Sequence, residues 1–326
     1  MSQVAPALGT RRLLDAPRAQ TAVIGAVSLL VALLFLYGMF TTDGFLTASN
    51  LKAILTATSF VGIVAVGMTA IMLSGNLFSL SLGTTAAVTA MFFLYALNFG
   101  LALAIVLTML LGLSIVGLQG LIVGAWGANP IIVTIGAGGV QAGVALWITG
   151  GQSILPPDDA TSYLHLARPL FGVPFGIYVF FGVAVVVHLV LRFTRFGREL
   201  TFMGENRQAA RAAGLPTVKL ATGAFAIAGA CTALTGVLIG ATSANGSLLL
   251  ESTYTYDAIA ATLVGGNAVT GGKGSVLRTV VGAIFIASVS DMLLLRGYST
   301  GVQILVKGLI VLGVVSLMNL NRIWQR

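Results

Sequence analysis

The sequence has little charge, one cysteine and two histidines. Only 8% of its 326 residues are charged, whereas a soluble domain carries about 25%. So few charged side chains cannot cover a water-facing surface of this size, which excludes a soluble enzyme or a soluble binding domain. The single cysteine, Cys231, excludes an intramolecular disulfide and a thiolate metal cluster. His165 has no second histidine or cysteine nearby, so we expect no metal site.

Motifs for catalysis and nucleotide binding are also missing. The nine acidic residues are scattered, which leaves no paired carboxylates and no Ser-His-Asp arrangement. The P-loop pattern does not occur, because the run Gly271–Ser275 places a glycine between its lysine and its serine. We therefore expect that the chain is not an enzyme and binds no cofactor. Its net charge of +8 sits in short loops and at both ends, a distribution typical of membrane orientation and not of nucleic-acid binding.

Apolar residues make up 57% of the chain, and the mean hydropathy is +1.00. A bilayer core of about 30 Å requires about 20 apolar residues in a helix, so the sequence predicts an all-α polytopic membrane protein. Its membrane domain is expected at 21–320, between a tail at 1–20 and a tail at 321–326. The eighth of ten expected spans is short enough to be re-entrant. The ten lie at 21–40, 53–73, 79–97, 99–123, 130–149, 173–191, 218–242, 256–270, 276–295 and 300–319.

The basic residues are distributed unevenly between the two sides that ten spans create. With a cytoplasmic N-terminus, 13 Lys and Arg fall on the inner side and three, Lys52, Arg168 and Arg296, fall on the outer side. Lys307 lies within a span. Because cytoplasmic segments carry the excess of Lys and Arg, both termini are predicted to be cytoplasmic.

One basic stretch, Arg192–Lys219, separates the sixth span from the seventh and holds six of the 17 Lys and Arg. Within it, Glu205–Gly214 predicts a short helix that ends at its glycine. The small side chains of Ala209, Ala210 and Ala213 would form a flat face that a partner protein could approach closely. The alternative is a solvated helix that only fixes the topology.

Polar side chains inside membrane spans are costly and are therefore candidates for function. Asp257 opens the eighth span and Lys307 lies in the tenth. We expect the two to pair across helices, since pairing lowers the cost of burying both charges, and we interpret the pair as fixing helix packing. Hydroxyl and amide groups that could line a polar pathway, or equally bond helix to helix, belong to Asn76, Ser79, Ser81, Thr134, Gln141 and Asn245.

The sequence also contains one possible internal repeat. Gly75-Asn76 is followed eight residues later by Gly83, and Gly266-Asn267 is followed eight residues later by Gly274. Duplicated halves of transporters leave such traces. Coincidence is an equal alternative, because glycine occurs 41 times in the chain.

Several blocks of the sequence resemble a known family. Asp257–Ser275 is similar to the Asp-Ala-Ile-Ala-Ala…Gly-Gly…Gly-Gly-Lys/Arg-Gly signature of the ribose-type monosaccharide permeases of ABC importers. Pro130–Gly136 with Thr149–Gln152, and Val306–Gly308, resemble further blocks of that family. The resemblance extends from about residue 50 to the end of the chain.

The resemblance implies a permease subunit of an ATP-driven importer, which forms the pathway for a monosaccharide in the bacterial plasma (inner) membrane. The implied partners are a cytoplasmic ABC ATPase that uses ATP and Mg, a periplasmic or extracellular sugar-binding protein, and a second permease copy or a paralogue. Gln208–Gly214 is similar to the E-A-A-x-x-x-G pattern of the coupling loop, here 192–219, with Gln in place of Glu. The implied ATPase-coupling residues are Glu205, Asn206, Gln208, Ala209, Ala210 and Gly214.

Two departures from the family pattern leave the identity of the sugar open. Ser74–Gly83 is one residue longer than the usual Gly-Gly-Ile-Asp-Leu-Ser-Val-Gly block and lacks its acid, and Ala142 stands in place of an arginine. Two other functions remain as alternatives. A stand-alone carrier or channel would place more acids in the membrane, and a membrane-embedded enzyme would need a convergent polar cluster.

Overall fold

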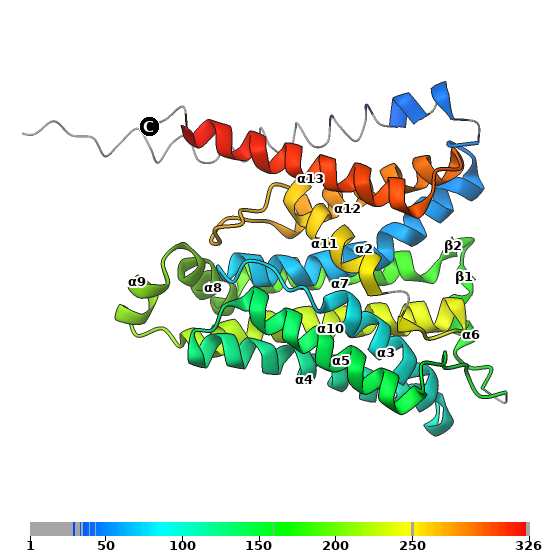
Figure 1. Cartoon of the computed structure of the whole chain (residues 1–326), viewed down its shortest axis with the longest axis horizontal. Coiled ribbons are helices and arrows are strands. Elements are labelled where there is room, and N and C mark those ends of the chain that lie inside the picture. Colours follow the sequence, from blue (N-terminus) through cyan, green and yellow to red (C-terminus); the bar gives the residue numbers. More distant parts are fainter. Residues whose placement is uncertain are drawn as a thin grey trace, which may run out of the picture.

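The computed structural model describes Leu29, Leu33, 35–38, 40–42, 44–158, 160–248 and 251–323. The expected tail 1–20, most of the expected first span 21–40 and residues 324–326 lie outside this part of the chain. The described residues form a bundle of helices, most of which run along one common direction (Figure 1).

The helices differ in length. The long ones are α2 (Ala48–Leu73), α4 (Leu101–Trp126), α5 (Pro130–Thr149), α7 (Phe175–Phe193), α10 (Thr217–Ser243), α12 (Val276–Leu295) and α13 (Thr300–Ile323). The shorter ones are α3 (Leu82–Ala96), the 3-10 turn η1 (Leu97–Phe99), α6 (Leu164–Ala167), α8 (Arg195–Glu205), α9 (Arg207–Ala212) and α11 (Glu251–Val264). Between α6 and α7, β1 (Pro169–Leu170) and β2 (Val173–Pro174) pair antiparallel.

Seven helices in the described part of the chain are long and apolar enough to cross a membrane: α2, α3 together with η1, α4, α5, α7, α10 and α12. The prediction of a helical membrane protein is confirmed at this level. Of the other three expected spans, 300–319 corresponds to α13, whose apolar stretch Thr300–Val314 is shorter than those of the seven. The expected span 256–270 corresponds to α11, which ends at Val264.

The helices α3 and α11 are too short to cross a bilayer by themselves. They have 15 and 14 residues, so each extends about 20 Å, against about 30 Å of hydrocarbon. The chain is not helical over 74–81, before α3, or over 244–247, after α10. Both short helices begin near the middle of the bundle and run toward opposite ends of it (Figure 1). Only α3 reaches spanning length, and it does so together with η1, as the 18-residue stretch Leu82–Phe99.

Glycine allows close helix packing between α4 and α10. A Cβ on Gly229 would lie 2.3 Å from the carbonyl oxygen of Gly112, and a Cβ on Gly112 would lie 2.6 Å from the Cβ of Ala233. Small residues let membrane helices approach in this way. The resulting body buries α2 and α10 most completely, whereas α5 and α7 stay largely exposed and present apolar side chains to lipid.

Candidate functional site

A polar network surrounds the start of α3, in the middle of the bundle. The backbone N–H of Leu80 donates to Thr134 Oγ1 (3.1 Å), and Ser81 Oγ donates to Gln119 Oε1 (2.8 Å). The hydroxyls of Ser79 and Ser81 lie 3.2 Å apart. One turn later, Thr85 Oγ1 donates to Gln141 Oε1 (2.8 Å), which lies on α5. Four of the six residues expected from the sequence to supply polar groups, Ser79, Ser81, Thr134 and Gln141, thus meet around one helix end.

A residue near the start of α11 also bonds to this network. The backbone N–H of Gly83, on α3, donates to Thr255 Oγ1, on α11, over 2.8 Å. The N-terminal halves of the two short helices are therefore in direct contact. Since a helix N-terminus carries partial positive charge, the start of α3 brings such charge to the centre of the bundle.

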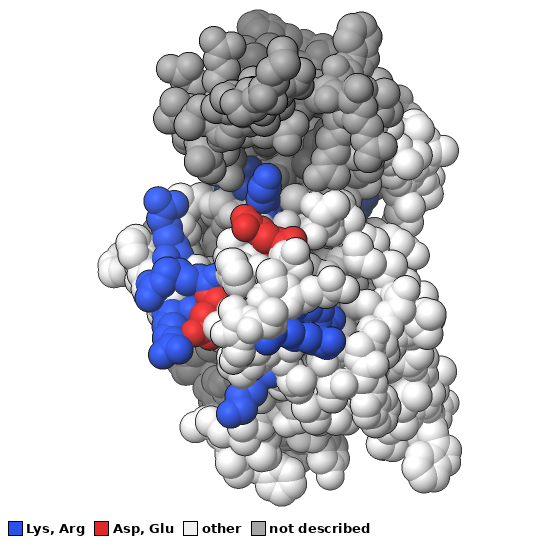
Figure 2. Space-filling view, turned by 90° about the vertical axis from the view of Figure 1, so that its left-hand side faces the viewer, with Lys and Arg blue, Asp and Glu red and all other residues white. Residues whose placement is uncertain are grey.

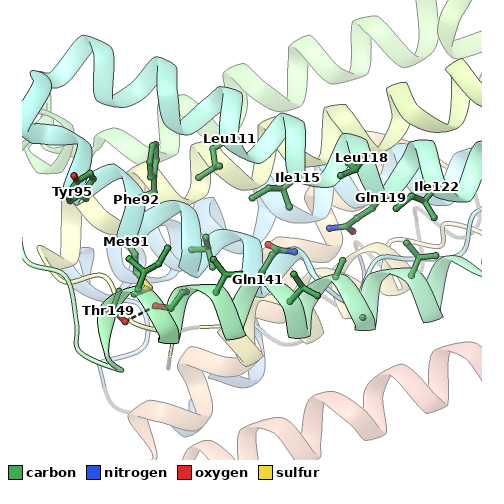
Figure 3. Close-up of a pocket in the computed structure, with 18 of the residues that line it drawn as sticks. Met91, Phe92, Tyr95, Leu111, Ile115, Leu118, Gln119, Ile122, Gln141 and Thr149 are labelled. Carbon is green, nitrogen blue, oxygen red and sulfur yellow. Dashed lines mark hydrogen bonds between the residues drawn. The ribbon is translucent and has the colours of Figure 1, made fainter.

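A cavity of about 910 Å³ adjoins the network, between α3, α4 and α5. Its wall is mainly apolar, and Figure 3 shows Gln119 on α4 and Gln141 on α5 directed into the space between those helices. Both glutamines are buried, with exposed fractions of 3% and 8%. Their Oε1 atoms are bound to α3, but their Nε2 atoms have no hydrogen-bond partner among the described residues. Two buried amide donors beside the cavity are thus unpaired within the described residues.

The other two expected pathway residues lie away from this network. Asn76 is buried near the end of α2, where its Nδ2 donates to Ser74 Oγ (2.8 Å). Asn245 is exposed in the turn that follows α10, where Ser243 Oγ donates to its carbonyl oxygen. The six residues therefore do not form one site: four lie at the centre, and one lies toward each end of the bundle.

Asp257 and Lys307 join α11 to α13. The Nζ of Lys307 lies 2.5 Å from Oδ1 of Asp257, and both side chains are buried. The pair is two residues beyond Thr255, so it lies close to the start of α11 that closes the polar network. Its position links the packing of α13 to the short helix.

At one end of the bundle, three segments meet backbone to backbone. A Cβ on Gly204, in α8, would lie 1.9 Å from the carbonyl oxygen of Leu73, and a Cβ on Gly271 would lie 2.4 Å from Cα of Gly75. The N–H of Gly272 donates to the same Leu73 carbonyl (3.1 Å). Gly75 and Gly271 have φ of +76° and +86°, which glycine adopts without strain. This glycine junction connects α8 with the unwound segment before α3 and with the loop between α11 and α12.

The short helix expected at Glu205–Gly214 is divided in two. Asn206 has φ −155° and ψ 100°, and its Oδ1 accepts from the N–H of Ala209 (2.9 Å), so it caps a new helix, α9. Glu205 instead ends α8. At the far end, Gly214 has φ +74°, and the bonds from Gly214 N–H to Arg211 and from Leu215 N–H to Ala210 form a glycine-terminated stop.

The alanine face predicted on this helix does not form as a unit. Ala210 is fully buried against the body of the protein, where it packs with Leu200 and Leu220. Ala209 and Ala213 are exposed. In a helix of 100° per residue, the alanines at adjacent positions cannot face one side. Of the expected coupling residues, Glu205, Asn206, Gln208, Ala209 and Gly214 remain accessible to a partner.

Arg207 anchors α9 to the end of α4. Its Nη2 donates to the carbonyl oxygens of Val123 (3.4 Å) and Gly124 (3.3 Å), where a cation also complements the C-terminal helix dipole. Burial, and to a lesser extent the charge of Arg211, lower the pKa of Arg207. A guanidinium keeps its proton in proteins, so the anchor remains charged.

Figure 2 shows that Lys and Arg gather at the end of the molecule that carries α8 and α9. The exposed basic residues of α7, α8, α9, the start of α10 and the loop before α12 are Arg192, Arg195, Arg198, Arg211, Lys219 and Lys273. The acidic residues Glu199 and Glu205 belong to the same segment. One end of the bundle is thus strongly basic.

Comparison with known proteins identifies the family. A family model described as "Branched-chain amino acid transport system / permease component" matches residues 50–315. The chain belongs to this permease family. The match covers the polar network, the glycine junction and α9, so each of these features lies within the permease fold.

Similar proteins include transporters from several bacteria. The permease is 29% identical to the ribose import permease protein of Haemophilus influenzae over 288 residues, which cover 87% of this chain and 88% of that protein. It is 29% identical to the ribose import permease protein of Escherichia coli K12 over 87% and 90% of the two chains. It is also 28% identical to the L-arabinose transport system permease protein of that strain, over 87% of each chain. The permease is accordingly a multi-pass protein of the bacterial plasma membrane.

The structure also shows residues at these sites that were not predicted from the sequence. Gln119, Thr85 and Thr255 complete the polar network, and Arg207 anchors α9. Gln119 is a polar residue within a long apolar run, a signal that could have been used. The roles of the two threonines depend on which helices meet, and the sequence carries no sign of that.

Proposed function

We propose that this permease forms the translocation pathway of an ATP-driven ABC importer for a monosaccharide. One observation carries the proposal: the starts of two short helices, α3 and α11, meet at a buried hydroxyl and amide network, within a chain similar over most of its length to ribose and arabinose permeases. Sugar hydroxyls both donate and accept hydrogen bonds. The network therefore matches them better than it matches an ion or an apolar solute.

In this proposal the chain crosses the membrane ten times, and both termini are cytoplasmic. The membrane domain comprises 21–320, with the coupling loop 192–219 on the inner side. The basic end formed by α8, α9 and the neighbouring segments supports this orientation, since Lys and Arg are retained on the cytoplasmic side. The short helices α3 and α11 each form half of a crossing.

The coupling helix α9, presented by α8, is the proposed docking site for the cytoplasmic ATPase, which hydrolyses ATP with Mg. Contact with the ATPase would be made by Glu205, Asn206, Gln208, Ala209 and Gly214, while Ala210 holds α9 to the body. Movement of α8 would reach the pathway through the glycine junction, because the backbones of Gly204, Gly75 and Gly271 are in contact there. The unwound segment 74–81 leads from this junction to the start of α3.

Sugar is proposed to pass the central network, where Ser79, Ser81, Thr134 and Gln141 are joined by Gln119. Asn76 and Asn245 would line the two ends of the same route. The Asp257–Lys307 pair lies behind the start of α11, and its proposed role is to fix α13 against that helix. Hydrogen bonds that are few and shared between helices suit a pathway, since a solute that bound tightly would not leave.

The remaining partners follow from the same proposal. The outer loop 150–172 is the longest connection opposite α9, and it is the proposed contact for a periplasmic or extracellular sugar-binding protein. A second copy of the permease would complete the pathway, because symmetric pairs are the commonest assembly. The second copy could pack against the exposed apolar face of α5.

Reconstitution tests the function. The permease is placed in proteoliposomes with its ATPase and binding protein, and uptake of radiolabelled ribose and arabinose is measured with ATP, without ATP and with an imposed ion gradient. We expect uptake that requires ATP and the binding protein. Uptake driven by the gradient, with no ATPase present, would instead identify a stand-alone carrier.

A further inference from the structure

A second cavity lies at the basic end of the molecule, beside α8. It has a volume of about 580 Å³ and is enclosed by the last turn of α7, by α8 and by the start of α12. Three arginines, Arg192, Arg198 and Arg278, and one acid, Glu205, contribute to its wall. The cavity therefore has an excess of positive charge.

Arg278 is the buried charge in this wall. Its exposed fraction is 6%, and its side chain makes no hydrogen bond or ion pair with any other described residue. Partial loss of hydration is unfavourable for a cation that has no partner in the protein. An anion in the cavity would remove that cost.

The N-terminus of the helix that carries Arg278 also favours binding of an anion. Arg278 is the third residue of α12, a helix of 20 residues whose N-cap, Ser275, makes no side-chain capping bond. The first N–H groups of a helix are free donors and carry partial positive charge. A cation at this end of a helix is repelled rather than compensated, so Arg278 and the helix end favour the same ligand.

Exposed apolar residues flank the arginines of the cavity. On α7, Leu189 and Phe193 are exposed apolar residues just before and after Arg192, and on α12 Leu277 is exposed next to Arg278. Apolar side chains facing lipid thus give way to arginine at this depth. The wall also includes Leu73 and Val276, which offer apolar surface beside the charges.

We propose that this cavity binds the phosphate of an anionic membrane lipid in the leaflet on the side of α8. The phosphate oxygens would accept hydrogen bonds from the Arg278 guanidinium, whose fork matches phosphate geometry, and from the first N–H groups of α12. Arg192 and Arg198 would lie at the cavity mouth, and the acyl chain would run over Leu277. Basic pockets between membrane helices recognise lipid headgroups by this chemistry.

Native mass spectrometry of the full-length permease tests this directly. The detergent-solubilised protein is titrated with phosphatidylglycerol or with phosphatidylcholine, and bound lipid is counted. We expect wild type to prefer phosphatidylglycerol and R278Q to bind it about tenfold more weakly, the loss of one strong charged contact. The matched control K219Q removes one exposed basic charge from the same end, and it should bind as wild type does.

Thermal unfolding provides a second measurement that does not depend on counting lipid. Phosphatidylglycerol should raise the Tm of wild type and of K219Q, but not that of R278Q, whose Tm without lipid should equal or exceed that of wild type. Equal lipid preference in wild type and R278Q, or an equal loss in K219Q, would overturn the proposal. A comparable rise in Tm with inorganic phosphate alone would also overturn it, by assigning the cavity to a free anion.

Discussion

At the scale of single residues, the buried polar side chains of this apolar protein are of two kinds: some are paired with one another, and others have an unpaired group. Asp257 and Lys307 neutralise one another between α11 and α13. Gln119 and Gln141 accept hydrogen bonds through Oε1 from Ser81 and Thr85, and their Nε2 groups have no partner among the described residues. A satisfied pair contributes to packing, whereas an unsatisfied group costs free energy unless a ligand completes it. The two kinds of residue should therefore respond differently to substitution.

For the ion pair, we expect Asp257→Leu alone to lower the free energy of unfolding by about 3–5 kcal/mol, because Lys307 is left buried without a counter-charge. The double variant D257L/K307L should recover most of that stability and of the uptake, since it removes both charges. Unfolding of the purified variants in detergent measures the first effect. If uptake stays lost in a stable double variant, the pair contacts solute and is not only a packing element.

For the cavity amides, we expect Gln119→Leu to reduce ATP-driven uptake about tenfold, the loss of about one hydrogen bond to the passing solute. Its free energy of unfolding should fall by only about 1 kcal/mol, because Ser81 Oγ loses its acceptor while Leu fills a similar volume in an apolar wall. Ile122 lines the same cavity, so Ile122→Leu serves as the matched control. Its uptake should stay close to that of wild type. Unchanged uptake in Q119L would remove Gln119 from the pathway.

At the scale of elements, the molecule depends on two short helices and on the small helix α9. The starts of α3 and α11 are held together by the bond from Gly83 to Thr255, and α9 is held to α4 by Arg207. The glycine junction lies between these two places and joins α8 to the segment before α3. Elements that touch through backbone transmit displacement well, because no flexible side chain lies between them.

The anchor of α9 can be tested separately from its docking surface. We expect Arg207→Ala to leave the permease folded and bound to the ATPase, but to reduce uptake several-fold for each ATP hydrolysed, because α9 would no longer move with α4. Arg211→Ala, on the exposed side of the same helix, should keep the ratio of uptake to hydrolysis. The ratio is measured in proteoliposomes, and an unchanged value in R207A would show that the anchor is not needed.

At the scale of the whole molecule, the bundle has a basic end and an end with few basic residues. The basic end collects α8, α9 and the loop before α12 (Figure 2). The opposite end carries the loop of β1 and β2 (Figure 1). A membrane protein with this distribution is oriented by its charges, so the side that α9 faces decides which partner reaches it.

Cysteine labelling checks the orientation. The native Cys231 is buried, so it should give little background with a membrane-impermeant maleimide. We expect Thr161→Cys, in the exposed outer loop, to be labelled in intact cells. Ala213→Cys, at the end of α9, should be labelled only after the membrane is opened. Labelling of A213C in intact cells would reverse the orientation and exclude a cytoplasmic ATPase as the partner of α9.

Composition and local pattern were sufficient for the larger features of this protein. Lipid as the main solvent follows from the 8% of charged residues, and the positions of most long helices follow from apolar runs of about 20 residues. The stop at Gly214, just after α9, could be predicted because a glycine stop depends only on local sequence. The cap at Asn206 is equally local, and was missed because the helix was expected to begin at Glu205.

The site required the tertiary structure. Ser79, Ser81, Thr134 and Gln141 could be named from the sequence as polar residues in apolar runs, but Asn76 and Asn245 looked the same and lie elsewhere. Gln119, Thr255 and Arg278 matter because of what packs against them. Hydropathy is a property of each segment alone, whereas a shared hydrogen bond or an unpaired buried charge depends on which segments meet. The sequence by itself therefore determined the solvent, the helices and the side chains available, and only the tertiary structure decided which of those side chains share a site.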